Sequence, residues 1–104
     1  MFRMAYNFNT QMTFKNGLTI SFAIGEGNYC ANRNLTSGIN PYATYAKERE
    51  SENCEIIVFD VGGNDLDIKQ FLSEGITGDG NKVAGWISPD TLVEVMNNVK
   101  SWKE

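Results

Sequence analysis

Two alternating segments on either side of a Lys-Asn-Gly sequence constrain the fold more than any other feature of this chain. In residues 6–14 and 18–24, mostly apolar side chains occupy every second position, as in strands with one buried face. A two-residue turn at Asn16 and Gly17 would put the apolar side chains of the two strands on opposite faces, because a one-residue shift reverses every side chain. We therefore predict a β-hairpin with a three-residue loop, 15–17, and a left-handed Gly17. The predicted cross-strand pairs are Phe14 with Leu18, Met12 with Ile20, Thr10 with Phe22, and Phe8 with Ile24.

Three segments after residue 53 carry further signals. Residues 54–59, CEIIVF, form a nearly continuous apolar run, which is typical of a central strand covered on both faces. Residues 82–87 predict a short strand, with Gly85 at a bulge or a close approach. Residues 67–76 fit either a short helix or a strand, and both alternatives stay open.

The C-terminal segment predicts an amphipathic helix over residues 89–103. Ser88 is a suitable N-cap, and Pro89 suits the first helical position. Apolar side chains recur at helical spacing: Leu92, Val95, Met96, Val99 and Trp102. We expect residues 1–104 to form one α+β domain, in which a mainly antiparallel sheet of three to five strands begins with the hairpin and carries this helix.

Residues 25–53, between the hairpin and the CEIIVF strand, predict a long irregular loop, and such loops are usually functional or disordered. The loop begins with GEGN, which suggests a phosphate-binding glycine loop. No predicted helix follows, however, the GxGxxG pattern fails at Cys30, and Glu26 would repel a phosphate. A strand exit that needs flexible backbone is the simpler interpretation.

The composition excludes several classes of protein. The chain contains no histidine, which is the commonest general base and metal ligand. Ser-His and Cys-His nucleophile pairs are therefore excluded, together with most zinc sites, and we expect no catalysis, no cofactor and no metal. The net charge of −4 argues against a nucleic-acid partner, because nucleic-acid binders carry a basic patch.

The acidic and cysteine residues have structural interpretations. Two turns contain Asp60, Asp65, Asp67 and Asp79, without the spacing of a calcium loop. Cys30 and Cys54 form no CxxC motif; two reduced thiols are the expected state, and a disulfide is the alternative. The sequence contains neither a signal-peptide pattern nor a run that approaches a membrane span, so we expect a cytoplasmic protein without a membrane partner.

Polar and aromatic residues of the long loop are candidates for a contact surface, since Tyr, Asn and Ser make adaptable contacts. Covering a sheet edge is an equally good explanation for the tyrosines. Trp86 and Trp102 fit core or rim positions better than a base-stacking platform. The candidate partner-binding residues are Glu26, Asn28, Tyr29, Asn32, Arg33, Tyr42 and Tyr45. An alternative anion site would use the backbone amides of Gly25 and Gly27 with Arg33.

Three segments together resemble small accessory proteins encoded by tailed bacteriophages: F-x-N-G-x-x-x-S at 14–21, G-x-G-x-Y at 25–29 with Asn32 beyond it, and V-x-G-W-I-S-P-D at 83–90. The resemblance covers scattered positions over most of the chain and carries over no catalytic residue. It implies a non-catalytic protein that inhibits a host factor, such as a defence protein, by direct contact in the host cytoplasm.

Two other functions stay open: a small-molecule binder that sequesters a cyclic or linear nucleotide, and a virion or structural component. A homodimer is a further possibility, because a second subunit would cover the second face of the CEIIVF strand.

Overall fold

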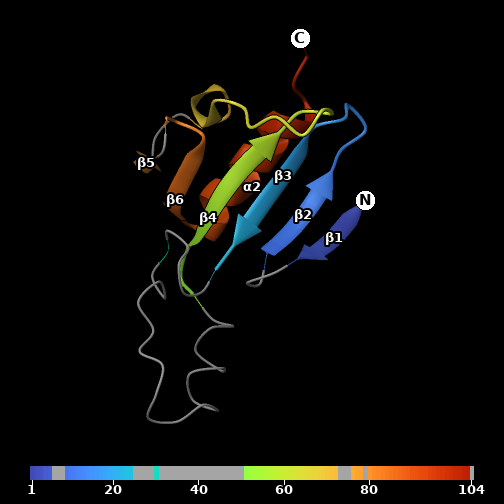
Figure 1. Cartoon of the computed structure of the whole chain (residues 1–104). Coiled ribbons are helices and arrows are strands. Elements are labelled where there is room, and N and C mark those ends of the chain that lie inside the picture. Colours follow the sequence, from blue (N-terminus) through green and yellow to red (C-terminus); the bar gives the residue numbers. More distant parts are fainter. Residues whose placement is uncertain (6–8, 25–29, 31–50, 73–75, 79, 104) are drawn as a thin grey trace.

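The chain folds as an antiparallel β-sheet with one α-helix packed on it (Figure 1). The computed structural model describes residues 1–5, 9–24, 30, 51–72, 76–78 and 80–103. The elements in chain order are β1 (Phe2–Ala5), β2 (Asn9–Thr13), β3 (Thr19–Ala23), β4 (Cys54–Phe59), the 3₁₀ turn η1 (Ile68–Gln70), β5 (Ile76–Gly78), β6 (Val83–Ile87) and α2 (Pro89–Lys100). Among these residues the sheet has six strands in the order β1-β2-β3-β4-β6-β5. The predicted α+β class is confirmed.

The hairpin formed by β2 and β3 has the predicted register. Two of the four predicted pairs are present in the ladder: Met12 with Ile20 and Thr10 with Phe22. The amide of Phe14 donates to the carbonyl of Leu18 at 2.9 Å, and Gly17 has a φ of 89°. The three-residue loop with a left-handed glycine is therefore confirmed. Phe8, which was predicted to pair with Ile24, lies outside the described residues.

Two short strands extend the sheet beyond the expected elements. β1 pairs with β2 along one edge, and β5 pairs with β6 along the other. β1 has four residues and β5 has three, which is too short for apolar alternation to be recognised in a sequence. Because of these two strands, the described sheet has six strands instead of the three to five expected.

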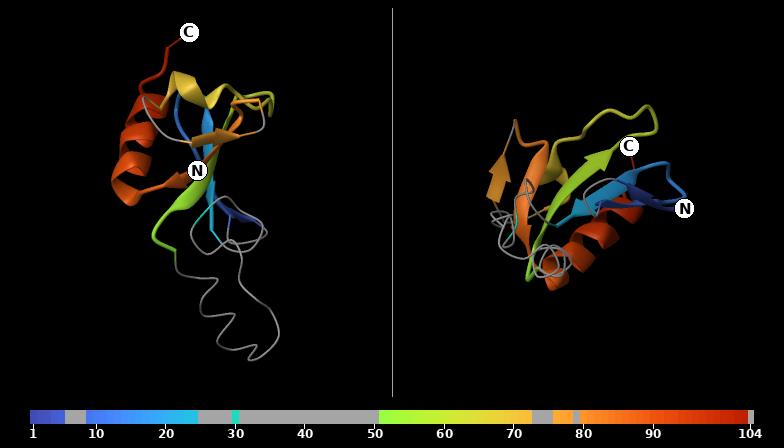
Figure 2. Two further views of the ribbon diagram at one scale, coloured as in Figure 1. Left: turned by 90° about the vertical axis from the view of Figure 1, so that its left-hand side faces the viewer. Right: turned by 60° about the horizontal axis from the view of Figure 1, so that its bottom comes forward.

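Helix α2 covers one face of the sheet (Figure 2). The amide of Thr91 donates to the hydroxyl oxygen of Ser88 at 3.2 Å, which confirms the predicted N-cap. Val95 and Val99 are fully buried. The other members of the predicted stripe pack against the core while partly buried: Leu92, Met96 and Trp102. The helix ends at Lys100, before the predicted end at residue 103.

Strand β4 is central, as predicted, and its two faces are buried to different extents. Its buried side chains lie toward the core: Cys54, Ile56 and Val58. The intervening residues are half-buried: Glu55, Ile57 and Phe59. The second face of β4 is therefore partly covered, whereas the sequence predicted cover on both faces. In the described part of the chain the second face carries no helix, and polar pairs lie on it instead: the Asn9 amide donates to the Ser21 hydroxyl at 2.7 Å.

The ambiguous segment 67–76 contains a single helical turn and the start of a strand. The Asp67 carboxylate caps η1 by accepting a hydrogen bond from the Lys69 amide at 3.0 Å. Phe71, which follows the turn, is buried in the core, and β5 begins at Ile76. The segment is therefore neither one short helix nor one strand, the two alternatives that the sequence left open.

Asn16 connects the first hairpin to the last helix. Its side-chain amide donates to the carbonyl of Val99 at 2.7 Å and lies 3.3 Å from that of Trp102, at the C-terminal end of α2. Its side-chain oxygen accepts from the amide of Leu18 at 3.1 Å. One side chain therefore shapes the hairpin loop and caps α2 at the same time.

We predict that Asn16→Ala lowers the free energy of unfolding by about 1–2 kcal/mol, because helix carbonyls lose their donor and the loop loses its acceptor. Urea denaturation measures the change. Lys15→Ala, at the exposed neighbouring position, is the matched control and is expected to change stability by less than about 0.5 kcal/mol. Equal effects of the two variants would contradict the capping role.

Candidate functional site

The residues predicted to contact a partner or an anion lie outside the described residues: Gly25, Glu26, Gly27, Asn28, Tyr29, Asn32, Arg33, Tyr42 and Tyr45. The described strands show where this part of the chain leaves and rejoins the sheet. β3 ends at Ala23, which is paired with Glu55 near the start of β4. Both positions lie at one end of the sheet, opposite to the β2–β3 turn (Figure 1).

The acidic turn residues have structural roles. The Asp60 carboxylate accepts hydrogen bonds from the backbone amides of Gly62 and Asn64, both at 2.9 Å. Backbone and side-chain hydrogen bonds from Asn64, followed by the bond from Gly62, hold the pKa of Asp60 below its ordinary value. Asp67 caps η1, and Asp79 lies outside the described residues. Within the described ranges no group of three His, Cys, Asp or Glu side chains is placed to hold a metal ion.

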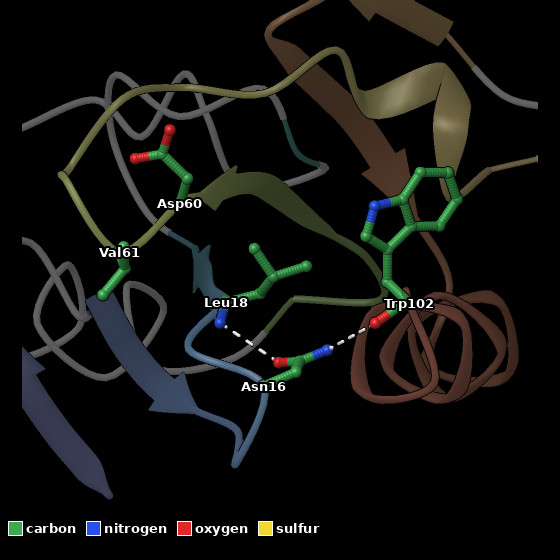
Figure 3. A pocket seen from close by; sticks show the side chains of 5 residues that line it. All are labelled: Asn16, Leu18, Asp60, Val61 and Trp102. Atoms are coloured by element: carbon green, nitrogen blue, oxygen red, sulfur yellow. Dashed lines mark hydrogen bonds between the residues drawn. The ribbon is translucent and has the colours of Figure 1, made fainter. Parts of the chain in front are cut away.

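A cavity of about 410 Å³ opens at the end of the sheet where the hairpin loop, the turn after β4 and the end of α2 meet (Figure 3). It is lined by Asn16, Leu18, Asp60, Val61 and Trp102. The Trp102 ring packs edge-on against Phe71, with ring centroids 4.9 Å apart. Asn16 is hydrogen-bonded to the end of the helix, and Asp60 to its own turn. Because its polar side chains already serve the fold, this cavity is a weak candidate for a ligand site.

The clearest departure from local structural rules is at Trp86 in β6. Ile87 pairs with Cys54 and Ala84 pairs with Ile56, with a register shift between the two pairs. β6 therefore holds one extra residue, which defines a β-bulge. Trp86 has a φ of 55°, in the left-handed region that such a bulge normally assigns to glycine. Its side chain is 42% exposed.

A left-handed backbone costs a bulky L-residue roughly 1–2 kcal/mol, so the fold alone favours glycine at this position. The sequence predicted a bulge or a close approach at Gly85. The bulge is present in this part of β6, but the residue with the left-handed backbone is Trp86, next to Gly85. The exposure of Trp86 fits the predicted rim position, and the partial burial of Trp102 fits the core. The sequence could not reveal the strain at Trp86, because it arises only when β6 pairs with a strand far away in the chain.

Trp86 lies at the end of the sheet that contains the two ends of the long loop. Its neighbour Ile87 is paired with Cys54, the first residue of β4, and Glu55 is paired with Ala23, the last residue of β3. The predicted contact residues therefore lie in the stretch of chain that follows β3 and precedes β4, and β4 is the strand that pairs with β6 beside Trp86.

Neither cysteine is in a disulfide and both are buried: Cys30 is 2% exposed and Cys54 is 7% exposed. Burial, followed by the electrostatic effects of Cys30 and Glu55, raises the pKa of the Cys54 thiol to about 12. Cys54 is therefore protonated at neutral pH, and a protonated thiol is a poor nucleophile and metal ligand.

No protein-family model, curated protein or solved structure matches this chain. In the described ranges, no helix combines the length and apolar character needed to cross a membrane.

We predict that Trp86→Gly unfolds at higher denaturant concentration than Trp86→Ala. Both variants lose the indole, but only glycine relieves the left-handed backbone, so the glycine variant should be more stable by about 1 kcal/mol. Urea denaturation of the two proteins measures the difference. An alanine variant as stable as the glycine variant would show that the backbone at residue 86 is not strained.

The raised pKa of Cys54 predicts a loss of stability at alkaline pH. Because the folded pKa is near 12 and the ordinary value is 9.0, the stabilising contribution of the thiol is fully present below about pH 9 and falls as the pH rises toward 12. The slope is at most about 1.4 kcal/mol per pH unit.

The difference in unfolding free energy between the wild type and Cys54→Ala, measured against pH, isolates this effect from other titrating groups. Alanine creates a small cavity and lowers stability at every pH, but it has no proton to lose. We expect the difference between the two proteins to shrink above pH 9. A constant difference from pH 8 to 11 would show that the thiol ionises as readily in the folded protein as in the unfolded chain.

Proposed function

We propose that this protein acts without catalysis, by binding another protein through a surface that includes Trp86. The observation that carries the proposal is the left-handed, 42% exposed tryptophan on the bulge of β6. Strained backbone is often found at functional sites, and tryptophan is among the residues that dominate binding energy in protein interfaces.

The resemblance to phage accessory proteins supports a host protein as the target, and a defence protein is one such target in the host cytoplasm. One of the three segments that carry the resemblance, 83–90, contains Trp86 itself. The tyrosines and the arginine predicted from the sequence remain candidate anchors, because their stretch of chain joins the sheet at the same end as Trp86. They are Tyr29, Arg33, Tyr42 and Tyr45.

We propose no second function. Sequestration of a nucleotide relies on the glycines and the arginine of residues 25–33, all of which lie outside the described residues, and the cavity near Trp102 has its polar side chains engaged in the fold. No contact among the described residues favours a virion component over a binding protein.

Affinity capture from a bacterial lysate with immobilised wild-type protein and Trp86→Gly tests the proposal. The glycine variant keeps the bulge geometry, so loss of the side chain is separated from loss of the fold. We expect a host protein captured by the wild type to be reduced at least about tenfold with Trp86→Gly, because buried tryptophan anchors contribute about 2 kcal/mol or more to binding.

Val93→Thr is the matched control. Val93 is an apolar residue of α2 that is 57% exposed, and threonine keeps its shape. Capture by this variant should equal that by the wild type. If Trp86→Gly, folded as judged by its denaturation midpoint, retains the same host protein at the wild-type level, the proposed binding surface is wrong.

A further inference from the structure

The outer edge of β1 has backbone groups directed away from the sheet. Met1 and Thr13 exchange two backbone hydrogen bonds, at 2.9 and 3.1 Å. Because paired residues in an antiparallel ladder alternate between bonded and non-bonded positions, Arg3 also bonds to β2. The N–H and C=O groups of Phe2 and Met4 therefore point away from β2, toward the open edge of the sheet.

The side chains of this edge have different characters on the two faces. Phe2 lies opposite Met12, on the face that carries α2, and is 77% exposed. Arg3 lies opposite Gln11 on the other face and is exposed. In the part of the chain that the structure describes, no hydrogen bond or ion pair to the Arg3 guanidinium is present. The edge thus presents an aromatic ring on one face and a positive charge on the other.

The charges of the chain are divided along the sequence. Residues 1–25 contain two bases, Arg3 and Lys15, and no acid, for a net charge of +2. The remaining residues contain seven bases and 13 acids, for a net charge of −6, and the two parts sum to the total of −4. The strand at the β1 edge therefore belongs to a basic part of an acidic protein, and this part attracts acidic segments.

A second copy of this chain is a poor occupant of the edge. Two β1 strands that pair in antiparallel fashion along their full length, with Phe2 opposite Met4, place Arg3 directly opposite Arg3 of the other copy. Like charges at directly opposite positions are destabilising. Registers displaced by two residues in either direction avoid this contact, but they pair three residues of each chain at most.

We propose that β1 binds an extended segment of a different protein, which adds to the sheet as a further antiparallel strand. The segment would carry an acidic residue opposite Arg3 and an apolar residue opposite Phe2. Backbone hydrogen bonds to the outward groups of Phe2 and Met4 would hold it, and the alternating side chains would select it. This inference does not depend on Trp86, which lies on a different strand near the other edge of the sheet.

Short fluorescent peptides of the sequence Thr-Val-Glu-Val-Thr and Thr-Val-Lys-Val-Thr probe the charge preference by anisotropy. The wild type should bind the Glu peptide about three- to tenfold more tightly than the Lys peptide. Arg3→Glu should reverse the preference. Lys15→Glu makes the same change in net charge within the same acid-free part of the chain, but outside β1, and should keep the preference for the Glu peptide.

The backbone contacts are tested by Phe2→Pro and Phe2→Ala. Both variants lose the ring, but only proline removes the outward N–H, and this group makes no bond to β2. Proline should therefore weaken binding of the Glu peptide at least about threefold more than alanine does. Equal binding by the two variants, or an equal loss of preference in Arg3→Glu and Lys15→Glu, would overturn the proposal. A wild-type homodimer in native mass spectrometry that Phe2→Pro dissociates would overturn it in favour of a second copy.

Discussion

The register of the β2–β3 hairpin determines which face of the sheet can receive the helix. With a three-residue loop, Met12 and Ile20 are paired and lie on one face, and the pairing of Ile20 with Val58 extends this apolar face into β4. A slip of one residue would turn these side chains toward solvent and leave the apolar stripe of α2 without a surface to cover. The length of this three-residue loop therefore determines on which face of the sheet α2 can pack.

Asn16 connects the hairpin loop directly to the end of α2. Its side chain holds the loop through the amide of Leu18 and the helix end through the carbonyl of Val99. The loop geometry places Asn16 at the end of the helix, where the Val99 carbonyl accepts from both the Asn16 side chain and the Trp102 amide. Local turn structure and long-range packing thus stabilise one another. The cavity beside Trp102 lies at this junction, and its polar side chains belong to the junction itself.

The sequence predicted those elements whose signal is local. The hairpin and α2 have complete periodic patterns, a suitable turn and a suitable cap, and the structure confirms them. β1 and β5 are too short to show a period. β4 was expected to be covered on both faces, because Ile57 and Phe59 are apolar although they lie on the half-buried face. An apolar run shows that a strand is apolar, but it does not show what covers each face.

The candidate sites were less accessible to sequence reasoning because they depend on pairing. The neighbouring Gly85 indicated a bulge in β6, but the position of the left-handed residue follows from the register with β4, which the sequence does not specify. The outward groups of β1 likewise follow from its pairing with β2. The composition of residues 25–45 predicted a contact surface independently. The described strands show that the chain leaves β3 at Ala23, opposite Glu55, and starts β4 at Cys54, opposite Ile87.

The two proposed surfaces differ in their effect on the stability of the protein without a bound partner. Trp86 has a left-handed backbone, which costs a bulky residue roughly 1–2 kcal/mol. The β1 edge carries no such strain, because water satisfies its outward N–H and C=O groups until another chain replaces it. Its cost is a risk of unwanted pairing, which Arg3 reduces by repelling a second copy in the full-length register. The two proposals therefore depend on different features of the sheet: a strained backbone at Trp86, and outward backbone groups at the edge strand β1.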